Sequence, residues 1–148
     1  MAAWRRFRSL DGRDRRVVAE AAALLVLVRA GLSVLPFKTL RRSLGYYAGP
    51  TRQTAVVADD VVRRVAWAVT AVARRIPMRT TCLVQSLAAD AMLRRRGCAC
   101  DLRFGVRPLQ DGPDRFPAHA WIEHRGVTVL GDIDGLRDYS VLSGPGDV

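Results

Sequence analysis

Lysine is almost absent from this chain of 148 residues, and histidine and cysteine are scarce. Lys38 is the one lysine, so arginine carries nearly all of the net charge of +10, and the sequence pI is near 11.1. This charge favours a negatively charged partner without identifying it, because an arginine-rich composition also gives an ordinary solvated surface. Two histidines and three cysteines make a short list of residues for acid-base or nucleophilic chemistry.

Long apolar runs are also missing. The run between Glu20 and Arg29 has eight apolar residues, whereas a membrane-spanning helix needs about 20. No clear small-x-small cleavage site follows the basic start, which argues against a signal peptide. We therefore predict a soluble helix here, and peripheral membrane contact is the less favoured alternative.

The odd number of cysteines argues against a disulfide framework. Cys82, Cys98 and Cys100 are therefore expected to be reduced thiols in a cytoplasmic protein. Hydrophobic residues make up 49% of the chain and charged residues 26%, which is typical of a folded protein. We predict one domain over residues 1–148, with a helical region at 1–76.

Helical periodicity, together with residues typical of helix starts and ends, predicts four helices. Asp11 and Asp14 mark the start of the first, and Gly31 and Pro36 mark its end. A short helix over 37–49 follows, then an amphipathic helix over 51–76 that Pro77 ends. The fourth helix covers 81–96, and Gly97 stands where a left-handed C-terminal cap belongs.

After Gly97 the apolar period changes from helical to alternating. Strands are predicted over 98–106 and 116–124, with a return strand after the Arg125-Gly126 turn. In the second strand His119, Trp121 and Glu123 share one face, opposite Ala118, Ala120 and Ile122. Helices followed by an antiparallel sheet indicate an α+β fold.

Cys82 is predicted in the first turn of the fourth helix. Unpaired backbone N–H groups and the positive end of the helix dipole favour a thiolate there, and the thiolate is the nucleophile. The same N–H groups could receive the oxygen of a tetrahedral intermediate. Neither Gln nor Asn immediately precedes Cys82 to supply a second oxyanion donor, and Gln85 lies a turn into the helix.

A cysteine nucleophile needs a base and usually a group that orients the base. His119 in mid-strand is a better candidate than His124, which falls at the hairpin edge. Asp132, after the return strand, is the candidate acid that would fix the imidazole tautomer, and Asp134 is the reserve. A small buried cysteine and a structural histidine remain the alternative interpretation.

Cys98 and Cys100 could be imagined as zinc ligands together with Cys82 and His119. Paired metal ligands usually flank a turn, however, and C-x-C on a strand lacks one. Core packing is the favoured interpretation of both cysteines, so no metal and no other cofactor is expected. Trp121 either walls a cleft or packs in the core, and the second role is commoner.

The stretches "CLVQSLAADAMLRRRG", "LRFGVRP" and "FPAHAWIEHRGVTVLGD" together resemble the stand-alone leader peptidase of lasso peptide biosynthesis, a transglutaminase-like cysteine peptidase. Cys82 matches the nucleophile of that family, His119 its histidine and Asp132 its acid. The resemblance implies a papain- or transglutaminase-like fold, with residues 77–148 as the catalytic core. It also implies proteolytic removal of the leader from a ribosomally made precursor peptide, without a cofactor.

Partners follow from the same resemblance. The precursor peptide would be the substrate, and a separate leader-recognition protein is expected because the first 76 residues lack the strands of a fused recognition domain. The cyclase that consumes the freed amine is a further expected partner. Two alternatives stay open: an acyltransferase that passes the thioester to an amine, and a non-catalytic basic module. No recognised nucleic-acid-binding motif appears, so no nucleic acid is expected.

Overall fold

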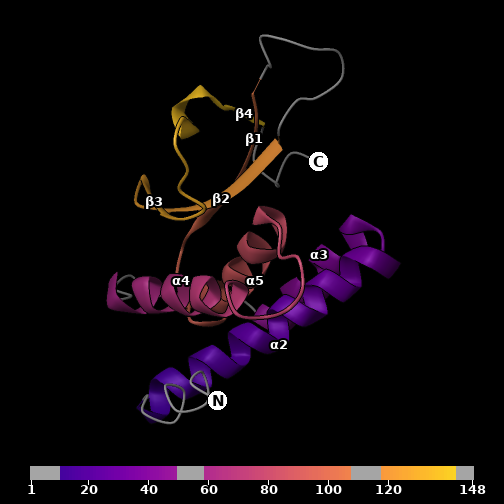
Figure 1. The fold of residues 1–148 in the computed structure, drawn as a ribbon, viewed down its shortest axis with the longest axis vertical. Coiled ribbons are helices and arrows are strands. Elements are labelled where there is room, and N and C mark those ends of the chain that lie inside the picture. The colour runs from indigo at the N-terminus through magenta and orange to yellow at the C-terminus, as the bar shows by residue number, and fades with distance from the viewer. Residues whose placement is uncertain (1–10, 50–58, 108–117, 143–148) are drawn as a thin grey trace.

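The computed structural model describes residues 11–49, 59–107 and 118–142, in which helices come first and a sheet follows. Figure 1 shows the helices on one side and the sheet on the other. The elements are α2 (Gly12–Val34), α3 (Phe37–Ala48), α4 (Asp59–Ala73), α5 (Cys82–Arg95), β1 (Asp101–Val106), β2 (Ala118–His124), β3 (Val127–Leu130), the 3-10 helix η1 (Leu136–Asp138) and β4 (Ser140–Leu142). The predicted α+β fold class is confirmed.

Helix α2 begins as the sequence predicts. The Asp11 carboxylate accepts a hydrogen bond from the backbone N–H of Arg13 at 2.6 Å, which satisfies one of the donors left free at a helix start. Leu25 and Val28 are fully buried in the core. Among the described residues α2 is the one helix whose length and composition would allow it to cross a membrane, a test that core helices also pass, and 33% of its most apolar window is buried.

Helix α5 is the centre of the fold and packs against α2, α3, α4 and β2. The Thr81 side chain caps its start by accepting from the N–H of Val84 at 3.4 Å, and Gly97 follows its end with φ 74°. From Val84 to Leu93 only Gln85 is not buried. Helix α5 is apolar on nearly every side, as expected for a helix that other elements enclose.

Helix α4 is shorter than predicted. The part of the prediction at 51–58 lies outside the described residues, and the helix ends at Ala73 instead of Ile76. The N–H groups of Arg75 and Ile76 both bond to the carbonyl of Val72, so the chain leaves the helix in a tightened turn before Pro77. Val65, Ala68 and Val72 are buried as the periodicity indicates.

The sheet has the order β3-β2-β1-β4, with antiparallel neighbours. Leu102 on β1 lies opposite Ile122 on β2, and both side chains belong to the core shared with the helices. The prediction that the first strand begins at Cys98 is wrong, because Cys98 N–H bonds to the Leu93 carbonyl and β1 starts at Asp101. Strand β4 was not predicted, because its three residues are all exposed and show no alternation.

Hydrogen bonds of the Glu20 carboxylate connect α2 with α3 and with the end of α5. This carboxylate accepts from Tyr47 Oη on α3 at 2.7 Å and from Arg96, just after α5, at 3.2 Å. Burial opposes ionisation of Glu20, but the bonds from Arg96 and Tyr47 outweigh it and hold the pKa of this carboxyl below its usual value. Charged hydrogen bonds therefore reinforce the apolar contact between α2 and α5.

Candidate active site

Cys82 is the first residue of α5, directly after the capping Thr81, and its side chain is half-buried. The backbone N–H groups at this end of the helix have no partner within the helix. An anion at Cys82, or an oxyanion on a bound acyl group, would therefore face donors and the positive end of the helix dipole. This is the placement that the sequence predicts.

Ser86 lies one helical turn after Cys82 and connects α5 to the sheet. Its buried hydroxyl donates to the carbonyl of Ala120 on β2 at 3.1 Å. Ala120 directly follows His119 in the strand. The helix start that carries Cys82 is thus tied, at one turn's distance, to the strand that carries His119.

His119 is held by the loop that follows β3. Its Nε2 lies 2.7 Å from the carbonyl oxygen of Gly131. A carbonyl only accepts, so Nε2 carries the proton and donates, and the neutral imidazole then has its lone pair on Nδ1. The nitrogen that could act as a base is therefore Nδ1.

Two aromatic side chains flank the imidazole of His119. The Trp121 ring is stacked at a centroid distance of 6.1 Å and an interplanar angle of 16°, and the Tyr139 ring is tilted at 5.8 Å. Trp121 is almost fully buried, and its Nε1 donates to Glu123 at 2.8 Å. It lies over Gly105, where a Cβ would come within 2.8 Å of the indole. Trp121 therefore both packs and supports the histidine.

The structure does not join the three candidate side chains directly. Ile122 faces the helices in the core, so alternation puts His119 and Trp121 on the opposite face of β2. Within the described residues, no hydrogen bond links His119 to Cys82, Asp132 or Asp134, and both carboxylates are exposed. The triad of Cys82, His119 and Asp132 therefore stays a prediction.

Gly131 is a site residue that the sequence analysis missed. It has φ 82°, a backbone conformation that glycine adopts readily. A Cβ here would lie 2.9 Å from the Ala120 carbonyl oxygen and 3.0 Å from the Trp121 side chain. Only glycine lets the loop approach β2 this closely and bring its carbonyl to His119. The signal was the "LGD" glycine beside the candidate acid.

The sequence profile of the transglutaminase-like superfamily matches residues 22–144, which include α5 and the whole sheet. The chain belongs to the transglutaminase-like superfamily. No curated protein matches it significantly, and neither does any solved structure. Typical members of the superfamily are cysteine peptidases and transglutaminases, and this agrees with a cysteine at a helix start and a histidine on the adjoining sheet.

The Cys–His contact that the structure does show in this transglutaminase-like domain joins Cys100 and His124, not the candidate pair. Cys100 Sγ lies 3.5 Å from Nδ1 of His124, and the same Nδ1 lies 3.1 Å from the Ala99 carbonyl. That carbonyl requires a proton on Nδ1, which leaves no lone pair to accept the thiol proton. Burial, and then the nearby Cys98, Asp90 and Asp101, raise the pKa of Cys100 to about 12. Cys100 is therefore a protonated thiol and a poor nucleophile.

A groove of about 1480 Å³ runs between α4 and β3 of the transglutaminase-like domain. Thr80, just before Cys82, lines it together with Gln85, Gly131 and Asp132. Gln85 Nε2 donates to the Thr80 carbonyl at 3.1 Å. The Gln85 amide thus holds the segment before the nucleophile, and the groove leads to the start of α5.

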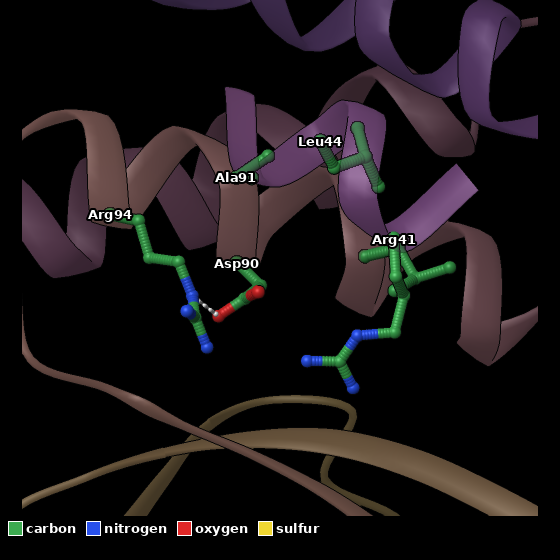
Figure 2. Close-up of a pocket in the computed structure, with 7 residues that line it drawn as sticks. Arg41, Leu44, Asp90, Ala91 and Arg94 are labelled. Atoms are coloured by element: carbon green, nitrogen blue, oxygen red, sulfur yellow. Dashed lines mark hydrogen bonds and ion pairs between the residues drawn. The ribbon is translucent and has the colours of Figure 1, made fainter. Parts of the chain in front are cut away.

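A smaller hollow of about 30 Å³ lies in the seam of α3 and α5. Figure 2 shows Asp90 bonded to Arg94, with Arg41 reaching in from α3. Burial raises the pKa of Asp90, and Arg94 and Arg41 oppose the rise. The hollow has room for about one water molecule, so it is no substrate site. Within the described residues no cluster of three His, Cys, Asp or Glu side chains could hold a metal ion.

Proposed function

We propose that this member of the transglutaminase-like superfamily is a cysteine peptidase that removes the leader from a ribosomally made lasso precursor peptide. The main support for this proposal is the position of Cys82 at the start of α5. One turn later in the helix, the Ser86 hydroxyl bonds to β2, the strand that carries His119. The sequence resemblance supplies the substrate. A separate leader-recognition protein and the lasso cyclase are the proposed partners, in a cytoplasmic setting.

In the proposed mechanism Nδ1 of His119 takes the thiol proton of Cys82. The thiolate attacks the scissile carbonyl, and the C–N bond breaks as His119 protonates the leaving amine. This yields a thioester between Cys82 and the leader. Water, deprotonated by His119, then attacks the thioester and releases the leader acid and the free thiol. The thiol and the imidazole must come together on substrate binding for the first step.

Intact-mass measurement tests this proposal. The protein is incubated with a precursor peptide and its recognition protein, and the expected products are the leader acid and the core peptide with a free amine. Cys82→Ala and His119→Ala should abolish cleavage and keep the helical circular dichroism. Cys100→Ala is the matched control and should cleave normally. Cleavage at the wild-type rate by Cys82→Ala would contradict the proposal.

Asp132 is the proposed orienting acid, and Asp134 is the alternative. Asp132 adjoins Gly131, whose carbonyl holds His119, so a small turn of this loop would bring its carboxylate to the imidazole. Asp132→Asn should slow turnover by about tenfold or more. A larger loss in Asp134→Asn would move the assignment to Asp134.

Acyl transfer to an amine is the second candidate, because the superfamily includes transglutaminases. It uses the same thioester, and only the acceptor differs. Product analysis with and without an added primary amine separates the two: a peptidase gives the leader acid in both, whereas an acyltransferase gives the leader amide when amine is present.

A further inference from the structure

The groove between α4 and β3 has features that the cleavage chemistry does not use. Arg63, Trp67, Thr70 and Arg74 follow one another at steps of four, three and four, so they form one row along α4 and onto the turn after it, where the N–H of Arg74 still bonds to the Thr70 carbonyl. All four line the groove, and Trp67 is 45% exposed. A solvent-facing tryptophan between two arginines is a strong candidate for a contact with a ligand.

The arginines of this row have no acidic partner in the described part of the chain. Arg64, next to Arg63, pairs with Asp14, but neither Arg63 nor Arg74 is paired with a carboxylate there. Among the described residues that line the groove, Asp132 is the only acid, against Arg63, Arg74 and Arg75. The wall on the α4 side is therefore positively charged and suits an anionic ligand.

The opposite wall is the free edge of a sheet. β3 stands at the end of the order β3-β2-β1-β4, so within residues 11–49, 59–107 and 118–142 no strand lies beside one side of its backbone. Thr128, Val129 and Leu130 line the groove along this edge. An edge strand binds an extended peptide by continuing the sheet, through main-chain hydrogen bonds that do not depend on sequence.

We propose that the groove binds an extended, acidic segment of the substrate peptide as an added strand on β3, with carboxylates on Arg63 and Arg74 and an apolar side chain on Trp67. The identity of the peptide as substrate rests on the proposed function, whereas the binding mode rests on the groove.

The dimensions set the spacing of the acidic residues. Arg63 and Arg74 are 11 residues apart, which on a helix is about 16 Å. An extended chain covers about 3.4 Å per residue. Side chains on one face of a strand recur at every second residue, so the two carboxylates should stand four residues apart, about 14 Å, with the apolar residue midway between them.

The direction of the groove connects this site to the chemistry. At one end Asp59, at the start of α4, lies 3.4 Å from Arg125 in the turn before β3. At the other end Arg74, Thr80 and Asp132 lead to Cys82 at the start of α5. Arg74 therefore contacts the part of the peptide nearer the scissile bond, and Arg63 contacts a more distant part.

Fluorescence anisotropy with synthetic peptides tests the proposal. The probe is a labelled peptide of alternating Thr and Val with two Glu four positions apart and one Leu midway between them. One control peptide has Lys in place of Glu, and a second has N-methylated alternate amides, which cannot pair with an edge strand. We expect the Glu probe to bind at least about tenfold more tightly than either control, and more weakly at high salt.

Matched variants locate the site. Arg63→Glu combined with Arg74→Glu should reverse the preference, so that the Lys peptide binds better than the Glu probe. Arg29→Glu combined with Arg42→Glu makes the same charge change at exposed positions of α2 and α3 outside the groove and should keep the preference for Glu. Equal affinity for the Glu and Lys peptides, no binding up to about 1 mM, or equal loss in both double variants would overturn the proposal.

The binding test of the groove and the cleavage test of the proposed function can fail independently of each other. Cys82→Ala should bind the Glu probe as the wild type does, because Cys82 does not line the groove. If the probe binds but no precursor is cleaved, the proposed groove function stands and the proposed peptidase activity is wrong. If the precursor is cleaved but no probe binds, the proposed peptidase activity stands and the proposed groove function is wrong.

Discussion

The hydroxyl of Ser86 on α5 donates to the carbonyl oxygen of Ala120 on β2 at 3.1 Å, in a buried position between the nucleophile helix and the histidine strand. Ser86→Ala leaves that carbonyl buried without this donor, which costs about 1–3 kcal/mol. Thermal unfolding should show the loss, and precursor cleavage should slow because α5 and β2 lose their polar tie.

Ser43→Ala is the control for Ser86. The Ser43 hydroxyl also donates to a carbonyl, that of Thr39 at 3.1 Å, but it lies on the exposed side of α3. Water replaces this bond, so the free energy of unfolding should change by less than about 0.5 kcal/mol. Equal effects of the two substitutions would contradict the role given to Ser86.

The three cysteines should react with iodoacetamide in a fixed order. Cys82 is half-buried at a helix start, whereas Cys98 is buried and Cys100 has a pKa of about 12. At neutral pH Cys82 should therefore be labelled first, which peptide mass mapping of the native protein would show. Faster labelling of Cys100 than of Cys82 would contradict the choice of nucleophile.

Gly105→Ala should destabilise the protein by about 1–3 kcal/mol, because the new Cβ would lie 2.8 Å from Trp121 and 3.0 Å from Tyr139. Both rings flank His119, so precursor cleavage should fall as well. Gly45→Ala is the matched control, since a Cβ in that part of α3 meets nothing within 4 Å. It should be neutral or slightly stabilising. Chemical denaturation of both variants checks the contrast.

Stability should fall in acid partly through Glu20. Its pKa is lower in the folded protein than the ordinary 4.5 because bonds from Arg96 and Tyr47 outweigh burial. Its contribution is therefore fully present above the unfolded value and is lost as the pH falls through the folded value. Glu20→Gln should therefore lower the unfolding temperature at pH 7. The gap in unfolding temperature between this variant and the wild type should shrink as the pH falls below 4.5.

Asp60→Asn serves as the control for that pH profile. Asp60 is an exposed carboxylate in the first turn of α4. Removing it should leave a profile parallel to that of the wild type. An acid-dependent gap as large as that of Glu20→Gln would show that overall charge, and not the Glu20 bonds, sets the acid stability.

Much of the fold follows from local pattern. Apolar spacing and the Asp11 cap predicted α2, and apolar spacing and Gly97 predicted α5, each to within a few residues; alternation predicted β2. The failures are also physical. Residues 98–100 alternate like a strand, yet the N–H of Cys98 completes the end of α5 by bonding to Leu93. Strand β4 carries no pattern because its pairing with β1 depends on a distant partner.

Local pattern was enough to predict a cysteine in the first turn of a helix and a histidine in a later strand, because helical and strand periodicity act over a few residues. Which atom holds that histidine depends on long-range packing. A register shift between Ile122 and Glu123 and the positive φ of Gly131 bring a backbone carbonyl to His119, where the sequence suggested the Asp132 carboxylate. The same packing sets α4 beside the free edge of β3 and so creates the groove, since side chains from two distant segments form its walls.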